Sequence, residues 1–393
     1  MTFMSETKFI DLRLPQIGFE MPITDAIMEL EKLRYKRLSG TTHPNVFFQL
    51  KHIFHMLESI GSSRIEGNNT TVMDYVETAK LQNEQSHLFD KGEDIREIRN
   101  VEYAMNYIEQ HIDDLEINKM LLRELHSLTV QGLSANREGA TNPGQFRRKN
   151  VRISGSNHVP PDFTQAEPLI DELIEFVNRE DAPKYDLLKI AVAHHRFVWI
   201  HPFENGNGRV VRLFTYALLL KKKIIKSNER IINLTAVFCS DRASYYSHLA
   251  AADRGTDEGL IDWAEYVLSG LKIELEKIDK LVDYTYLHDV ILLPALHDAR
   301  NNGYITEVEC NILKITIDKQ IVQAADLKKT LCDKSSSEVS RIIRGLVNKK
   351  MLCPVYENAR KYTIAFSNSL LIRSILTVLD KNGFLPHNNV SLE

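Results

Sequence analysis

The stretch HPFENGNGRVVR, residues 201–212, combines a histidine, a turn with two glycines and two arginines. The run YDLLKIAVAHHRFVWI (185–200) precedes it, and RVVRLFTYALLL (209–220) continues from its first arginine. Both runs carry apolar residues at three- and four-residue steps, which is typical of buried helices. The stretch is therefore predicted to form a tight loop between two helices.

The residue types of this loop suit the binding of an anion. Gly206 and Gly208 let the backbone turn sharply, and the helix that begins here directs unpaired N–H groups toward the same place. Arg209 and Arg212 share one face of that helix, so they can bracket a polyphosphate. His201 is expected at the rim, where an ordinary pKa of about 6.5 leaves a neutral imidazole able to accept a proton at pH 7. A capped loop with surface arginines and a packing histidine is the alternative interpretation.

The whole stretch resembles the signature of the Fic family, HPFx(D/E)GN(G/K)RxxR. The segments AHHRFVWI, GQFRRKNVRISGSNHVPP and RASYYSHLAAADRGTD are also similar to that family, so the resemblance covers roughly residues 40–275. It implies a mainly α fold, with a Fic-type helical core and a β-hairpin flap at residues 147–158. It further implies transfer of AMP from ATP to a Ser, Thr or Tyr hydroxyl, with release of pyrophosphate.

The resemblance assigns a role to each residue of the loop. His201 would be the general base that takes the hydroxyl proton. Arg209 would hold the phosphate chain, and Arg212 would hold the γ-phosphate and so orient ATP. The anion hole around the α- and β-phosphates would be formed by Gly206, Asn207 and Gly208.

Mg²⁺ is expected as the second cofactor beside ATP, bridging the phosphates. The family carries an acidic residue at the position of Asn205, and Glu204 precedes it in the variable slot. An amide oxygen can ligate a hard cation without contributing charge, so we expect metal binding to persist in weakened form. Tyr245 and Tyr246 match a place where the family packs a side chain near the adenine.

The segment SIGSSRIEGNNT, residues 59–70, is similar to the inhibitory motif (S/T)xxxE(G/N) of many Fic proteins. Ser62 and Glu66 are four residues apart, hence on one face of a short helix that Gly67 can end. The resemblance implies that Glu66 pairs with Arg212 and withdraws it from the γ-phosphate. The chain would then carry its own N-terminal brake.

The residues after about 300 change in character. Three helix-like segments, ITEVECNILKITI, AADLKKTL and SSSEVSRIIRGLVNKKM, precede two β-like runs in LCPVYENARKYTIAF. This order predicts a winged helix-turn-helix, and the three domains are expected at 1–110, 111–285 and 300–393. Basic residues outnumber acidic ones over 303–393, which permits DNA contact there, but winged helices also serve as dimerisation or protein-binding modules. A homodimer is expected.

The composition narrows the class of protein. The net charge of the whole chain, −4, does not indicate a nucleic-acid or membrane partner. Four cysteines without a CxxC pair indicate free thiols in a reducing compartment. No stretch approaches the roughly 20 apolar residues of a membrane span, and the first residues show no secretory pattern, so a cytoplasmic location is expected.

The partner is expected to be a protein hydroxyl docked on the flap by strand addition, or a hydroxyl of the chain itself. Two alternatives stay open. One is a non-catalytic, ATP-sensing winged-helix regulator that binds DNA. The other is a Fic enzyme that uses another nucleotide, such as UTP, or that removes AMP with Glu66 positioning the water.

Overall fold

The computed structural model describes residues 10–35, 41–81, 91–153, 156–225, 234–239, 241–331 and 334–385. The chain divides into two compact units. The first comprises Met1–Lys36, His55–Thr70 and Ser86–Leu275, and the second comprises Arg37–Phe54, Thr71–Gln85 and Glu276–Glu393. The sequence predicts three domains, and this division into two units does not test their bounds.

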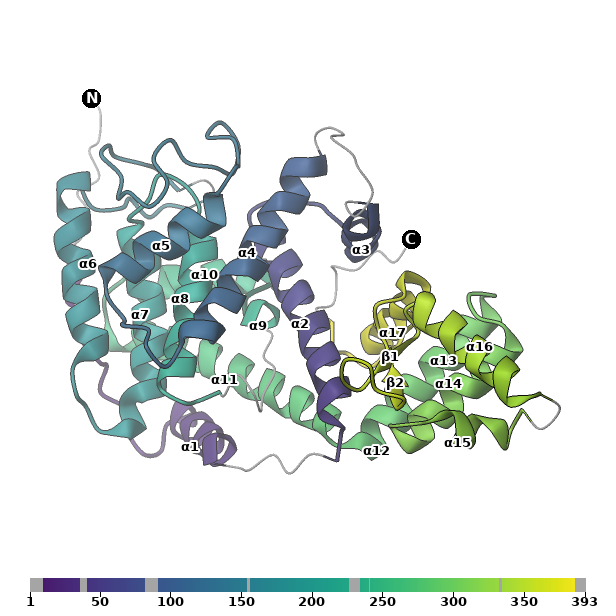
Figure 1. Ribbon diagram of the computed structural model, residues 1–393. Coiled ribbons are helices and arrows are strands. Elements are labelled where there is room, and N and C mark those ends of the chain that lie inside the picture. Colours follow the sequence, from purple (N-terminus) through teal and green to yellow (C-terminus); the bar gives the residue numbers. More distant parts are fainter. Residues whose placement is uncertain are drawn as a thin grey trace. The chain divides into compact units, whose positions relative to one another are not determined.

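The first unit is built from helices (Figure 1). These are α1 (Pro22–Tyr35), the end of α2 (Pro44–Ile65), α4 (Lys91–His111), α5 (Lys119–Val130), α6 (Phe163–Asn178), α7 (Asp186–Ile200), α8 (Asn207–Lys221), α9 (Leu234–Cys239), α10 (Arg242–Ala252) and most of α11 (Asp257–Val282). The helices α7 and α8 pack on each other and are buried over nearly their whole length. Buried residues lie on every side of both helices, which is the pattern of helices enclosed by others, and they include charged ones such as Arg209 and Arg212.

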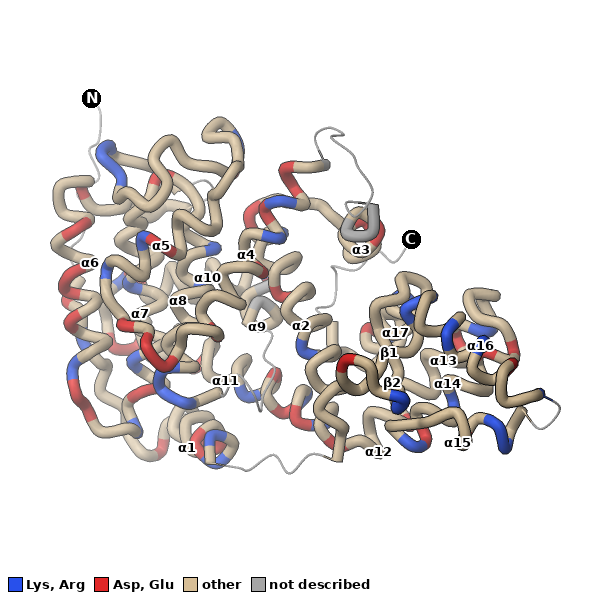
Figure 2. Tube along the Cα trace, in the orientation of Figure 1, with Lys and Arg blue, Asp and Glu red and all other residues tan. Residues whose placement is uncertain are grey.

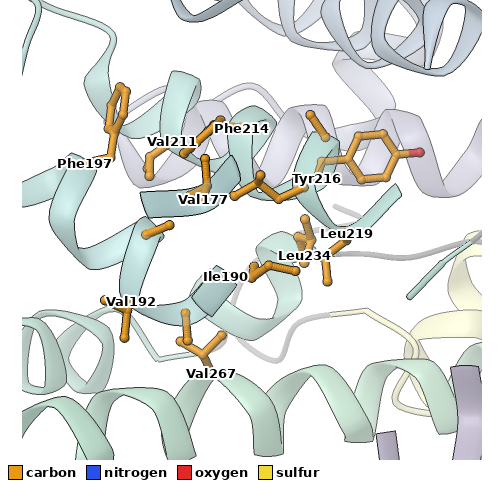
Figure 3. Packing of buried hydrophobic residues seen from close by; sticks show 14 of the residues in the cluster. Val177, Ile190, Val192, Phe197, Val211, Phe214, Tyr216, Leu219, Leu234 and Val267 are labelled. Carbon is orange, nitrogen blue, oxygen red and sulfur yellow. The ribbon is translucent and has the colours of Figure 1, made fainter. Parts of the chain in front are cut away.

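The core of this unit surrounds α7 and α8. Figure 3 shows Val192 of α7 and Val211 of α8 among buried side chains that also include Leu234 of α9 and Val267 of α11. Each such side chain stabilises the fold by about 1.5–3 kcal/mol through burial. Helix α6 differs from α7 and α8. It buries its apolar face and carries acidic residues along its opposite, exposed face (Figure 2). The loop between α7 and α8 therefore joins two helices of the buried core.

The flap segment differs from its prediction. Its described residues, 147–153 and 156–158, form no strand ladder. The backbone N–H of Arg147 instead donates to the carbonyl of Pro202 at 2.9 Å, which ties the segment to the loop after α7. The alternating polar and β-branched residues allow a strand but do not supply a partner for one.

The second unit contains the remaining elements (Figure 1). These are α3 (Val72–Leu81), α12 (Tyr284–Tyr286), a π-helical segment (Leu287–Leu292), α13 (Leu293–Asn301), α14 (Glu307–Lys319), α15 (Ala324–Lys328), α16 (Ser336–Asn348), β1 (Leu352–Pro354), β2 (Tyr362–Ile364) and α17 (Ser369–Lys381). Strands β1 and β2 pair antiparallel, with Leu352 opposite Ile364. Three helices followed by a hairpin is the order expected from the sequence, and the winged-helix assignment itself stays a prediction.

Capping boxes begin helices α14 and α16 of this unit. Thr306 and Glu309 exchange side-chain and backbone hydrogen bonds at the start of α14, and Ser335 and Glu338 do so at the start of α16. Within the described ranges, no helix is long and apolar enough to cross a bilayer.

Candidate active site

The loop between α7 and α8 is closed by its own asparagine. Asn207 Nδ2 donates to the carbonyl of Phe203 at 3.0 Å, and the N–H of Phe203 donates to Asn207 Oδ1 at 2.9 Å. His201 ends α7 in the left-handed conformation, with φ 51°. Gly206, with φ 74°, begins α8 and accepts the first helical hydrogen bond, from Val210. The side chain of Asn207 thus shapes the anion hole that the sequence predicts.

The imidazole of His201 is held neutral. Burial lowers its pKa to about 4, although the nearby carboxylate of Glu66 acts to raise it. Its Nδ1 is buried, and an interaction with the backbone of Val198 also acts to raise the pKa against the effect of burial. A neutral ring at pH 7 is the form that can accept a proton.

This pKa predicts a titration that proton NMR can follow. At about pH 5.5 an ordinary histidine is roughly nine-tenths protonated, whereas we expect the ring of His201 to remain neutral there because burial disfavours its charged form. The signal that disappears in His201→Ala identifies the residue. His126, whose pKa burial also lowers to about 4, is the internal control. A midpoint near 6.5 for His201 would contradict the burial argument.

The predicted contact between Glu66 and Arg212 is present. Arg212 Nη2 lies 2.8 Å from Glu66 Oε1, and Arg212 Nε donates to Ser62 Oγ at 2.8 Å. Arg212 Nη2 also donates to the carbonyl of Ser62 at 2.8 Å. Burial acts to raise the pKa of Glu66, but the charge and hydrogen bond of Arg212, together with the electrostatic effects of Arg209 and His201, hold that pKa below its usual value. The short helix expected from the sequence is the last turn of the 22-residue α2, and Glu66 follows its end.

The carboxylate of Glu66 also lies over the start of α8. A Cβ at position 208 would clash with Glu66 Oε1, so only glycine allows this approach. The carboxylate therefore occupies the place where the N-terminus of α8 is predicted to receive a phosphate. Glu66 thus contacts the second arginine of the loop and lies over Gly208 of the predicted anion hole.

Arg209 is fully buried and meets two carboxylates that sequence reasoning missed. Its Nη1 lies 3.0 Å from Glu97 Oε1, and its Nη2 lies 2.9 Å from Glu138 Oε2. Asn68 donates to the other oxygen of Glu97 at 2.8 Å. Burial raises the pKa of Glu97 to about 7, against the opposing charge of Arg209. No motif marks these two glutamates, because each reaches Arg209 from a distant segment.

Asn205, the expected metal ligand, is engaged within the protein. Its Nδ2 donates to the carbonyl of Arg137, and its Oδ1 accepts the N–H of Gly206, both at 2.7 Å. Glu204 faces Lys149, with 3.4 Å between Oε1 and Nζ. The described residues contain no group of three or more metal-ligating His, Cys, Asp or Glu side chains. The loop can therefore offer Mg²⁺ one neutral oxygen, through the remaining lone pair of Asn205.

The two adjacent tyrosines have different surroundings. Tyr245 is buried, and its hydroxyl lies 3.1 Å from Nε2 of His194, whose Nδ1 lies 2.8 Å from Thr215 Oγ1 of α8. Burial raises the pKa of Tyr245. Tyr246 is 40% exposed. Tyr245 belongs to the packing behind α8, and the adenine-side role of both tyrosines stays a prediction.

The segment that contains this loop is similar to known proteins. Residues 116–219 match the Fic/DOC family. The protein named Protein adenylyltransferase Fic from Drosophila willistoni is 33% identical over 178 residues, which are 44% of this chain and 32% of that protein. The protein of the same name from Aedes aegypti is 28% identical over 250 residues, 57% of this chain and 43% of that protein. The chain thus spans about a third to two fifths of the length of these relatives.

A solved structure shares the fold over most of the chain. The crystal structure of a Fic family protein from Desulfovibrio desulfuricans matches with a TM-score of 0.53 and 18% identity. The match covers 90% of this chain and 98% of that one.

Proposed function

The chain carries a domain of the Fic/DOC family, and from this premise we propose that it is a protein adenylyltransferase. It transfers AMP from ATP to a Ser, Thr or Tyr hydroxyl of a target protein or of itself. The name shared by its relatives supports this activity. The observation that carries the proposal is the carboxylate of Glu66 on Arg212 and Gly208, since it marks a built anion site beside a neutral histidine.

The reaction follows from the residues around that site. The phosphates of ATP replace the carboxylate of Glu66 at the N-terminus of α8 and at Arg212. The hydroxyl oxygen of the target attacks the α-phosphorus, its proton passes to the ring of His201, and the bond to pyrophosphate breaks. The N-terminus of α8 and Arg212 contribute positioning and charge stabilisation, which are the main requirements of phosphoryl-type transfer.

Mg²⁺, when bound, neutralises charge on the phosphates, and Asn205 is the residue of this loop that would hold it. We expect Asn205→Asp to lower the Mg²⁺ concentration for half-maximal rate by about tenfold, because it adds a formal charge to that oxygen ligand. Rates measured against Mg²⁺ concentration test this. Glu204→Gln changes charge in the neighbouring slot and serves as the control. An unchanged Mg²⁺ response in Asn205→Asp would remove this residue from metal binding.

The pairing of Glu66 with Arg212 makes the resting protein autoinhibited. One guanidinium cannot fully serve a carboxylate and a γ-phosphate at once, so the state with Glu66 bound is the inactive one. A target would dock along residues 147–158 by strand addition. A homodimer, a cytoplasmic location and DNA contact through residues 303–393 remain predictions.

Intact mass spectrometry tests the activity. The protein with Glu66→Gly is incubated separately with each of the four ribonucleoside triphosphates and Mg²⁺. We expect one or more adenylyl groups on the protein with ATP. A nucleotidyl adduct from UTP alone would give the alternative nucleotide, and no adduct on the chain or on proteins of a cell extract would contradict the proposal.

A further inference from the structure

Arg147, in the first position of the flap segment, is a buried cation that forms no ion pair within the described ranges, although the charge of Asp162 acts on it. It is 3% exposed. Its Nε donates to the carbonyl of His201 at 2.9 Å, and its Nη2 donates to the carbonyl of Ile200 at 3.5 Å. A buried charge is costly unless it is well hydrogen-bonded. Here the hydrogen bonds go to neutral oxygens, and the charge of Asp162 adds a favourable interaction.

Arg147 donates hydrogen bonds to the backbone carbonyls of His201 and of the residues directly before and after it. The guanidinium bonds the carbonyls of residues 200 and 201, and the N–H of Arg147 donates to the carbonyl of Pro202. These carbonyls lie at the C-terminal end of α7, where a positive charge is favoured. They also flank a left-handed histidine, a conformation that costs a non-glycine residue free energy and persists only when its surroundings hold it.

The same guanidinium also contacts the start of the flap segment and Pro161, which lies just beyond its end. Nη1 donates to the carbonyl of Lys149 at 3.2 Å and to Oδ1 of Asn150 at 3.4 Å. Nη2 donates to the carbonyl of Pro161. One side chain therefore fixes the residue proposed as base and the segment proposed to hold the acceptor.

We propose that Arg147 is a positioning residue, which sets the direction of the His201 imidazole and its placement relative to the flap segment. This inference rests on the proposed function. Arg147 acts through the backbone and touches no reacting atom. Its loss therefore affects the alignment of base and hydroxyl, and it leaves the phosphate contacts of Arg212 and Gly208 in place. Lysine cannot replace it, because a single ammonium cannot span carbonyls that a planar guanidinium reaches with separate donors.

The test compares Arg147→Lys and Arg147→Met in the Glu66→Gly protein, with Arg179→Lys as the matched control. Arg179 is an exposed arginine after α6 whose Nε bonds Asp181 at 3.2 Å. We expect kcat to fall roughly 10- to 100-fold in both Arg147 variants, as for a displacement of about 1 Å at a reacting centre. The Kd for ATP should stay within about twofold, and Arg179→Lys should match the parent.

A second readout is independent of activity. The NMR titration midpoint of His201 should move upward in Arg147→Lys, because a released loop exposes the ring to water. An unchanged midpoint in a folded Arg147→Lys protein would overturn the inference, whether or not the parent transfers AMP. An unchanged kcat would also overturn it, as would loss of ATP binding in parallel with kcat. If Arg147→Met fails to fold, Arg147→Lys alone decides. A parent without transfer would instead count against the proposed function.

Discussion

Replacing Glu66 with glycine is expected to increase AMP incorporation by about 10- to 100-fold. The substitution removes a charge-assisted hydrogen bond of 2.8 Å to Arg212, an interaction of about 1.5–3 kcal/mol that ATP must otherwise displace. It also removes the carboxylate that lies over Gly208. Initial rates with labelled ATP, for self-modification or for a target, measure the change.

Two further variants control this experiment. Glu66→Gln keeps the shape and a weaker neutral hydrogen bond, so its rate should lie between those of the wild type and Glu66→Gly. Glu66→Ala separates loss of the carboxylate from added backbone freedom next to Gly67, whose φ is 109°. Equal or lower incorporation in all three, with the fold intact, would count against the brake.

His201→Ala in the Glu66→Gly protein is expected to lower the rate of transfer by about 10²- to 10⁴-fold, the usual contribution of a positioned general base. ATP affinity should change by no more than about twofold, because the proposed anion site consists of the α8 N-terminus and the arginines and does not include His201. Single-turnover rates and calorimetric ATP titration separate the two effects.

The control for that variant is His111→Ala. His111 is an exposed histidine at the end of α4, with Nδ1 on the carbonyl of Tyr107 at 2.8 Å. This change should leave both rate and affinity as in the parent. Transfer that persists at the parent rate in His201→Ala would remove His201 from the role of base.

Much of the loop could be predicted because its determinants are local. The glycine at 206 and the histidine that ends α7 fix the turn through their own backbone angles, and the capping residues at 306 and 335 likewise mark helix starts. The contact between Glu66 and Arg212, which joins residues 146 positions apart, was predicted from family resemblance and not from spacing.

The partners of Arg209 and the contacts of Arg147 could not be predicted, because they join ordinary residue types that are far apart in the sequence. Glu97 and Glu138 resemble solvated surface carboxylates until the fold brings them to Arg209. Arg147 resembles its exposed neighbour Arg148, and only the course of the chain past Pro202 distinguishes them. The hairpin flap was predicted from family resemblance, and residues 147–153 and 156–158 form no strand ladder because strand pairing needs a partner as well as suitable residues.

The most direct test uses ATP labelled either at the α-phosphorus or at the γ-phosphorus, with the Glu66→Gly protein and Mg²⁺. In the proposed reaction the hydroxyl attacks the α-phosphorus, and the γ-phosphate, held by Arg212, leaves in pyrophosphate. It predicts that protein acquires the α-label and none of the γ-label. Incorporation of the γ-label, or of neither label while ATP is bound, would contradict it.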